Sequence, residues 1–492
     1  MKKLFLLIIS LMVMSYVSAQ LPVVRVVTDG PIVNTPAVHG TISVRDTDGS
    51  VITMHAGFKI RGTSSQQWEK KSYRVELWSD AIGTTMMDTT FLGMRSDDDW
   101  NLEAMYNQPL RLRNKVANDL WHEMYTLPYQ ESEPDASSAI NMKYVDLYVN
   151  DVHVGLYTLT ERVDRKMLGL KKFNGSMRGV LYKGNGEGNA SFEALPAYNN
   201  DLRTWDQFEW VYPNEEEAPV DWSSIYSFVN FVMNASDNAF YSQFSTMFEV
   251  DNAVDYFIFI NVLRALDNMD RNTFIARYKK TSPYFYVPWD LDATLGNTNE
   301  GSHNDFTYGL RSNGMFDRLL NDCSNNGYVA KVQQRYNALR TGILSKNHIM
   351  EMIQSQYNEL LAQGAYDIEH EAWPEFEADA SEIDYISDWL DRRFNYLDAT
   401  INYPCGSWEE DEMSDNGILV FPNPAQDRIN IRLTEPTDSH VFVYDMMGRC
   451  VTSANSNEQA ITIDMSSFAP GIYNVVVRNA ESQHVERVVV EE

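Results

Sequence analysis

The segment "NVLRALDNMDRNTFIARYKK", residues 261–280, places a cluster of polar residues between two hydrophobic stretches. Its hydrophobic run stops at Leu266, and a hydrophobic and aromatic stretch resumes six residues later. An ordinary amphipathic helix does not gather its polar groups in this way. The pattern therefore predicts a polar loop held between two parts of a hydrophobic core. Four of the six intervening residues carry a carboxylate or an amide: Asp267, Asn268, Asp270 and Asn272.

Asp267 and Asn272 are the first candidate site residues. An aspartate and an asparagine at this spacing in a loop can converge on one metal–phosphate centre. The aspartate would accept or orient a hydroxyl proton, and the asparagine would offer a neutral oxygen to Mg²⁺. The same spacing also occurs in loops whose Asp and Asn side chains bond their own backbone, so this alternative stays open.

A second polar motif follows in "YVPWDLDATLGN", residues 286–297. If the chain is extended here, Asp290 and Asp292 share a face, because alternate residues of a strand point the same way. Two adjacent carboxylates repel each other unless a cation lies between them. Hard oxygen ligands of this kind suit Mg²⁺, Mn²⁺ or Ca²⁺. The alternative is a strand-end turn with solvated acids.

Lys183 ends a predicted strand in "RGVLYKGNGEG", residues 178–188. A lysine in this position can contact a phosphate as a point charge. Glu161, in "LYTLTERVD", is a candidate partner for its ammonium group. The glycines that follow Lys183 are also typical of a plain hairpin turn.

A local basic cluster stands out in "KIRGTSSQQWEKKSYRVEL", residues 59–77. Arg61 and two lysines flank a Gly-Thr-Ser-Ser turn that contains Ser64 and Ser65. Hydroxyl groups and free backbone N–H groups in such a turn could hold an anion. A solvated hairpin tip is the alternative.

The composition narrows the possible partners and the compartment. The net charge of −29 disfavours nucleic acid and anionic membranes, which both attract a basic surface. Residues 1–19 have the basic start, hydrophobic stretch and small residues of a secretory signal peptide. No later stretch is hydrophobic enough to cross a membrane, so a soluble exported protein is expected. The three cysteines allow at most one disulfide.

The order of patterns predicts an α+β chain with a separate all-β tail. Residues 20–80 alternate like strands, whereas 222–265 and 327–400 are dominated by helical periodicity. Residues 403–416 hold five acidic and no basic residues, which is typical of a solvated linker. From residue 417 to 492, short strands separated by turn signals predict a small β-sandwich.

Several motifs together resemble the CotH family of spore-coat-type, atypical protein kinases. The matching segments include "RGTSSQQWEKKSYRVEL", "FLGMRSDDDWNL", "LRNKVANDLW", "VGLYTLTERVD", "GVLYKG" and "WDLDATLG", in that order. The resemblance covers most of residues 20–400 and implies a diverged, two-lobed kinase fold over 20–402.

The resemblance also implies roles for the candidate residues. Asp267 falls at the catalytic aspartate and Asp290 at the metal-binding aspartate, with Asn272 and Asp292 as further metal ligands. ATP with Mg²⁺ or Mn²⁺ is the implied cofactor. Lys183 would contact phosphate, and Glu161 would pair with that lysine. The segment that covers the nucleotide would include Arg61, Ser64 and Ser65.

The tail resembles the C-terminal sorting domain of the type IX secretion system. The segments "VFPNPAQDRINIRL", "VFVYDMMGRCV" and "IDMSSFAPGIYNVVV" carry this resemblance, with Pro422, Asn423 and Pro424 at a turn. It implies a Gram-negative bacterium of the Bacteroidetes kind and the type IX machinery as a partner. The protein is then expected to be released or attached at the cell surface.

Two functions of different classes follow. The first is an exported kinase that transfers the ATP γ-phosphate to a serine or threonine hydroxyl of a protein. The second is a non-catalytic surface binding or adhesion protein on the same fold, because fold does not dictate function. A glycoside hydrolase, suggested by the aromatic residues and carboxylate pairs, is a more distant alternative. Convergence of Asp267, Asp290 and Lys183 would favour the kinase.

Overall fold

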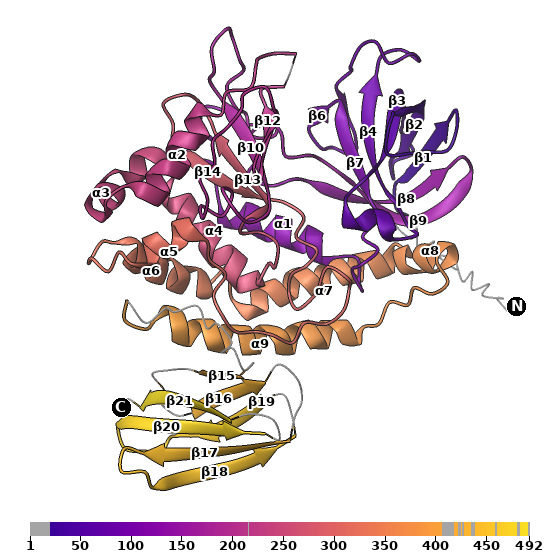
Figure 1. Cartoon of the computed structure of the whole chain (residues 1–492). Helices are drawn as coiled ribbons and strands as arrows, with labels where there is room; N and C mark the ends of the chain where they lie inside the picture. Colours follow the sequence, from indigo (N-terminus) through magenta and orange to yellow (C-terminus); the bar gives the residue numbers. More distant parts are fainter. Residues whose placement is uncertain are drawn as a thin grey trace, which may run out of the picture. The chain divides into compact units, whose positions relative to one another are not determined.

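The computed structural model describes residues 20–490 apart from 215, 406–417, 422–424, 426–427, 434–437, 458–459 and 480–482 (Figure 1). The predicted signal peptide, most of the acidic linker and the predicted Pro-Asn-Pro turn lie outside the described residues. The described chain contains both helices and sheets, which confirms the α+β class. Two compact units can be distinguished, and the second includes the C-terminal tail.

The first unit runs up to Leu112 and also contains Ile140–Arg162 and Glu351–Ala380. Its centre is a closed barrel with the strand order β1-β2-β3-β4-β7-β9-β8, in which β1 and β8 pair in parallel. Strand β1 shows why these residues form a barrel wall, because Val24 and Val26 are buried inside while Arg25 is exposed. The barrel strands are β1 (Val23–Thr28), β2 (Val38–Arg45), β3 (Val51–Arg61), β4 (Ser72–Trp78), β7 (Asp99–Glu103), β8 (Met142–Val149) and β9 (Val152–Thr160).

Smaller elements complete this unit. A short 3₁₀ helix, η1 (Ser64–Gln67), follows β3, and β5 (Thr89–Thr90) pairs with β6 (Ser96–Asp97). Helix α8 (Ala365–Ala372) packs on barrel residues through a hydrophobic cluster that includes Leu156 and Tyr366. Residues 365–372 are thus joined to strands that precede them by about two hundred positions in the chain.

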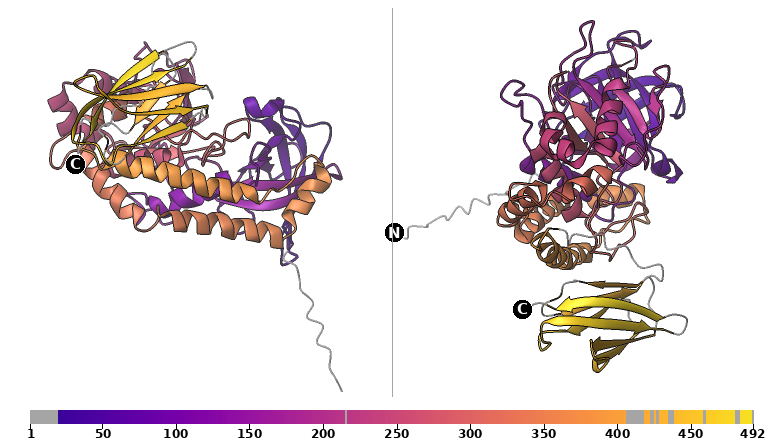
Figure 2. Two further views of the ribbon diagram at one scale, coloured as in Figure 1. Left: turned by 90° about the horizontal axis from the view of Figure 1, so that it is seen from below. Right: turned by 60° about the vertical axis from the view of Figure 1, so that its left-hand side comes forward.

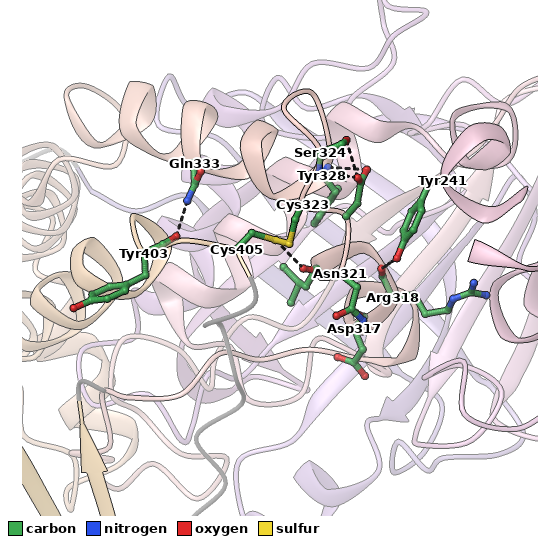
Figure 3. The surroundings of a disulfide bond; sticks show 12 residues. Tyr241, Asp317, Arg318, Asn321, Cys323, Ser324, Tyr328, Gln333, Tyr403 and Cys405 are labelled. Atoms are coloured by element: carbon green, nitrogen blue, oxygen red, sulfur yellow. Dashed lines mark hydrogen bonds between the residues drawn. A yellow bond between two sulfur atoms is a disulfide. The ribbon is translucent and has the colours of Figure 1, made fainter. Parts of the chain in front are cut away.

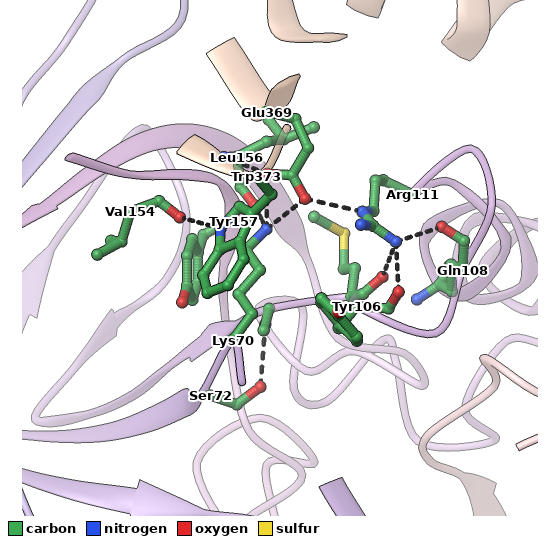
Figure 4. Close-up of polar contacts among 12 residues, drawn as sticks. Lys70, Ser72, Tyr106, Gln108, Arg111, Val154, Leu156, Tyr157, Glu369 and Trp373 are labelled. Carbon is green, nitrogen blue, oxygen red and sulfur yellow. Dashed lines mark hydrogen bonds and ion pairs between the residues drawn. The ribbon is translucent and has the colours of Figure 1, made fainter. Parts of the chain in front are cut away.

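A buried ionic cluster fastens α8 to the barrel (Figure 4). The Lys70 ammonium lies 2.7 Å from both carboxylate oxygens of Glu369, and the Arg111 Nε donates to the same carboxylate at 3.0 Å. The Leu156 N–H also donates to Glu369. Gly155 permits this approach, because a Cβ there would come within 2.7 Å of the Glu369 carboxylate. Lys70, one of the two lysines of the predicted basic cluster, is therefore a core residue and is not available to an anion at the turn.

The second unit contains Arg113–Ala139 and Val163–Met350 and resumes at Ser381. Its sheet has five strands in the order β11-β12-β10-β13-β14. The strands are β10 (Val180–Asn185), β11 (Thr204–Trp205), β12 (Phe208–Tyr212), β13 (Arg271–Arg277) and β14 (Tyr284–Pro288). The helices are α1 (Arg113–Met124), α2 (Ser223–Asn234), α3 (Asp237–Met247), α4 (Val250–Leu263), α5 (Gly314–Leu320), α6 (Tyr328–Arg340) and α9 (Ser381–Ile401). Helix α7 (Lys346–Ala362) begins in this unit, and its residues from Glu351 onward belong to the first.

The helical predictions for this part of the chain are confirmed. Helix α9, labelled in Figure 1 and the lighter of the two long orange helices in Figure 2, lies in the predicted helical range and buries Ile386, Leu390 and Leu397 along one side. Helix α4 is buried on all sides from Asn252 to Leu263, because its sequence is hydrophobic around most of its circumference. It is the central helix of the unit, and its C-terminal end leads into the polar loop.

A disulfide joins Cys323 to Cys405, with 5.4 Å between the Cα atoms (Figure 3). The bridge closes a stretch of 82 residues that includes all of α9. The Gln333 side chain of α6 also donates to the Tyr403 carbonyl at 2.9 Å. The segment after α9 is thus held at two points, and Cys450 keeps a free, exposed thiol.

Removing this bridge by Cys323→Ser together with Cys405→Ser is expected to lower the free energy of unfolding by roughly 4–5 kcal/mol. The reason is the large loop, whose closure restricts the unfolded chain. Urea unfolding followed by tryptophan emission measures the effect, since all 11 tryptophans precede residue 417. Cys450→Ser is the control and should leave the midpoint unchanged. A loss below about 1 kcal/mol would contradict a stabilising bridge.

The tail forms two antiparallel sheets. One contains β15 (Ile418–Phe421), β16 (Arg428–Leu433) and β19 (Ala460–Asp464), and the other has the order β18-β17-β20-β21. Both sheets contribute to one hydrophobic cluster, with Ile431 and Ile463 from the first and Val443 and Val475 from the second. The strands of the second sheet are β17 (Ser439–Asp445), β18 (Cys450–Ser456), β20 (Gly471–Arg478) and β21 (Gln483–Val490). Among the described residues, no helix has the length and hydrophobicity that a bilayer span requires.

Candidate active site

The loop that carries Asp267 begins where α4 ends. Arg264 closes the helix in a left-handed conformation, with φ at 47°, and turns the chain away from the helix axis. The Leu266 N–H then donates to the Ala293 carbonyl at 3.4 Å, and its own carbonyl accepts from Arg311 at 2.7 Å. The first polar motif is therefore bonded through its backbone to the segment that contains the second.

Asn272 and Asp290 lie at the same end of the β13–β14 pair. Thr273 pairs with Pro288 in this antiparallel ladder, and the Trp289 N–H donates to the Asn272 carbonyl at 3.1 Å. Asn272 immediately precedes the first of these pairs, and Asp290 comes two residues after Pro288. Both residues are left-handed, with φ at 49° and 58°, a conformation that is uncommon outside glycine but that Asn and Asp adopt more readily than other residues.

The strand geometry predicted for Asp290 and Asp292 is wrong. Strand β14 ends at Pro288, and the left-handed backbone at Asp290 breaks the alternation on which a shared face depends. The residues that follow are held instead by side chains of α1. The Asn114 side chain accepts from the Leu291 N–H at 3.1 Å, and the buried Arg113 donates to the Thr294 carbonyl at 3.1 Å.

The buried side chain of Asn268 connects the Asp267 loop to the Asp290 loop by hydrogen bonds. Its side-chain amide donates to the Asn272 carbonyl at 2.9 Å and to the Trp289 carbonyl at 2.7 Å. Only 2% of its surface is exposed. The neighbour of Asp267 is therefore bonded both to the candidate metal ligand Asn272 and to the residue that precedes Asp290.

Lys183 lies on the strand next to this hairpin. In the register of the sheet it stands opposite Phe274 of β13 and Glu209 of β12, so the three side chains share one face. The Phe274 ring in turn packs edge-on against Trp289, with 6.3 Å between the ring centres. Phe274 on the neighbouring strand therefore lies between Lys183 and Trp289, the residue that precedes Asp290.

The Asp267 carboxylate has a partner in a loop that the sequence did not single out. The Asn299 side chain donates to Asp267 Oδ2 at 2.9 Å, which fixes the orientation of the carboxylate. Nearby, burial raises the pKa of Asp270, against the opposing effect of Arg271. The Asp270 backbone carbonyl accepts from the Gly186 N–H at 3.1 Å.

Comparison with known proteins identifies the family at this point. Residues 58–397, well over half of the chain, match the family described as CotH kinase protein. The chain belongs to the CotH kinase protein family. All of the candidate residues, from Arg61 to Asp292, lie inside the matched region. Residues 419–491 match a secretion system C-terminal sorting domain, which implies secretion or export to the cell surface.

One curated relative is the inner spore coat protein H of Bacillus subtilis (strain 168). It is 23% identical to this CotH-family chain over 236 residues, covering 48% of this chain and 58% of the relative. The alignment therefore spans less than two thirds of the relative's length.

Two solved structures align with short parts of the chain. An immunoglobulin-like DUF3244 protein from Bacteroides vulgatus is 19% identical and covers 16% of this chain and 90% of its own, with a TM-score of 0.15. PorZ, a type IX secretion component of Porphyromonas gingivalis, is 21% identical and covers 17% of this chain and 13% of its own, also at 0.15. At these TM-scores neither structure bears on the fold.

Four residues that the CotH resemblance assigns to the nucleotide lie in the first unit. Arg61 pairs with Glu103, and Ser64 and Ser65 begin the 3₁₀ helix η1. The Glu161 carboxylate is fully buried and accepts from the Arg95 N–H and from two N–H groups of Asn141, each at 3.0 Å. Glu161 is thus engaged inside its own unit, and its pairing with Lys183 stays a prediction.

Several residues that build this site were not identified as site residues from the sequence. Asn268 was noted only as part of a polar run, and Arg113 and Asn114 only as part of the CotH motif "LRNKVANDLW". A buried arginine inside a family motif is a usable signal, because an unpaired buried charge is costly and implies a fixed set of acceptors. Asn299 lies in a polar loop and carries no such signal.

Proposed function

We propose that this CotH-family chain is an exported atypical protein kinase. It transfers the γ-phosphate of ATP to a serine or threonine hydroxyl of a protein, with Mg²⁺ or Mn²⁺. Its catalytic part, residues 20–402, is a two-lobed kinase-like domain. An acidic linker over 403–416 leads to a β-sandwich sorting domain over 417–492, which delivers the protein to the type IX machinery; residues 1–19 are the signal peptide.

The observation that carries this proposal is the joining of two polar loops. Hydrogen bonds from Leu266 to Ala293 and from Asn268 to Trp289 bring the Asp267 segment against the Asp290 segment. Phosphoryl transfer depends mainly on such positioning and on charge stabilisation, because the protein has little covalent chemistry to do.

The donor set fits a divalent cation. Asp290, Asp292 and Asn272 offer carboxylate and amide oxygens, the ligands that Mg²⁺ and Mn²⁺ prefer. A bound cation would supply neutralisation of phosphate charge at this place. Lys183 adds a positive charge on the adjacent strand and would contact a phosphate oxygen as a point charge.

Asp267 is assigned to the acceptor. Its carboxylate would orient the substrate hydroxyl and receive its proton, while Asn299 holds Oδ2. The acceptor oxygen then forms a bond to the γ-phosphorus, and the bond between that phosphorus and the β–γ bridging oxygen breaks, which leaves ADP. Arg61, Ser64 and Ser65 are assigned to nucleotide contacts, and Glu161 to the placement of Lys183.

Incubation of the full exported chain with γ-labelled ATP and Mg²⁺ or Mn²⁺ tests the proposal. Label is expected on casein or on the protein itself for the wild type, and none for Asp290→Ala. Asp151→Ala is the matched control, because Asp151 is also a left-handed aspartate, with φ at 63°, but lies in the exposed β8–β9 turn. A wild type that neither binds nucleotide nor transfers label would favour a surface binding protein.

A further inference from the structure

Asn268 is a buried polar residue of the loop, unlike the two aspartates beside it. It is 2% exposed, whereas Asp267 and Asp270 are partly exposed. Its amide nitrogen donates to two backbone carbonyls, those of Asn272 and Trp289, which belong to two different loops. A planar amide can donate two hydrogen bonds at once, whereas a hydroxyl can donate one and a carboxylate none.

The backbone of Asn268 is held from the other side by α4. The Tyr256 hydroxyl donates to the Asn268 carbonyl at 2.5 Å and lies 2.7 Å from the Thr273 hydroxyl at the start of β13. Tyr256 is fully buried and stacks on Tyr286 of β14, with 4.5 Å between the ring centres. Asn268 is therefore fixed to the rigid core of the unit before it contacts the loops.

The two carbonyls that Asn268 binds are next to the two left-handed residues. The Trp289 carbonyl belongs to the peptide unit that enters Asp290, and the Asn272 carbonyl belongs to the one that leaves Asn272. The orientation of these peptide units sets the backbone angles of both residues, which are left-handed. That conformation is uncommon for residues other than glycine, although Asn and Asp adopt it more readily than most.

We propose that Asn268 is a positioning residue that fixes Asn272 and Asp290 relative to Asp267. It touches neither nucleotide nor acceptor, and it acts through the backbone of the residues that do. This inference rests on the proposed function for its effect on transfer. The coupling of the two loops by Asn268 is a separate claim, which can be measured without ligand.

The test compares Asn268→Ala with Asn252→Ala in the full chain. Asn252 is also a fully buried asparagine with two backbone hydrogen bonds, one from its amide to the Tyr286 carbonyl at 3.1 Å and one from the Tyr286 N–H at 2.6 Å. It joins α4 to the middle of β14, and none of its hydrogen bonds involves either loop. Comparing the two variants therefore distinguishes a general loss of stability from an effect on the site.

Hydrogen exchange of the ligand-free protein is the first readout. In Asn268→Ala, peptides covering 264–273 and 288–295 should both exchange at least about tenfold faster, because opening the link releases about 1.4 kcal/mol or more of local protection. Asn252→Ala should leave both peptides unchanged relative to the rest of the unit. Unchanged exchange over 288–295 in Asn268→Ala would overturn the inference.

Binding of Mn²⁺ with ATP is the second readout. Asn268→Ala should weaken it at least about tenfold relative to Asn252→Ala, and equal affinities would overturn the positioning role. If the wild type binds no Mn²⁺–ATP, the proposed function fails, while the exchange result still decides whether Asn268 couples the two loops.

Tyr256→Phe is the second variant if Asn268→Ala does not fold. It removes only the hydroxyl that holds Asn268, and a smaller increase of exchange in the same two peptides is expected.

Discussion

Asp267→Asn is expected to bind Mg-ATP as tightly as the wild type and to transfer phosphate about 100- to 10,000-fold more slowly. The carboxylate is assigned to the acceptor hydroxyl, so its loss removes an interaction that forms in the transition state rather than with bound nucleotide. An asparagine keeps the size of the side chain and an oxygen that can accept from Asn299, so the loop should remain in place.

Calorimetry with Mg-ATP and label incorporation into casein measure the two halves of this result. Asp290→Asn provides the contrast, because loss of a metal ligand should weaken both nucleotide binding and transfer. Asp151→Asn should alter neither. Transfer at the wild-type rate by Asp267→Asn would show that this aspartate is structural.

Glu369→Gln is expected to lower the free energy of unfolding by about 3–5 kcal/mol, since it leaves buried cations without their counter-charge. Lys70 and Arg111 both bind the Glu369 carboxylate, and all three residues are almost fully buried. Lys70→Met should cost less, because Glu369 then keeps Arg111 as its partner. Urea unfolding followed by tryptophan emission measures both, and equal losses for the two variants would contradict this account of the cluster.

The pH dependence of the same cluster has a definite sign. Burial lowers the pKa of Lys70 from 10.5 to about 7, against the attraction of Glu369. Between these two values the unfolded chain binds more protons than the folded chain, so the free energy of unfolding should rise as the pH increases from about 7 to 10. Lys70→Met should show a smaller rise in the same range.

The sequence predicted those elements whose signal is local. The stripe along α9 and the alternation in the first strands are periodic within a few residues, and burial follows that period. The closure of the barrel was not predicted, because β1 pairs with β8 across more than a hundred residues, as in Val23 with Asp146. Three cysteines likewise leave the partner of Cys323 open until the fold brings Cys405 to it.

In the candidate site, too, the residue types could be predicted from the sequence, whereas the long-range contacts could not. The types of Asp267, Asn272 and Asp290 suggested metal and phosphate chemistry, and the CotH resemblance gave them roles. The extended geometry expected at Asp290 is absent, because the backbone there is left-handed. The Trp289 carbonyl that precedes it accepts from Asn268, a residue 21 positions away in the chain. No periodicity encodes such a bond.

If the Asp267 and Asp290 loops form one metal–nucleotide site, ATP binding must depend on the cation. Titration of ATP into the full chain, with and without Mg²⁺ or Mn²⁺, measures this dependence. The account predicts binding that requires the cation, that is weakened at least about tenfold in Asp290→Asn, and that is unchanged in Asp151→Asn. Binding that needs no cation, or that is equal in the wild type and Asp290→Asn, would contradict it.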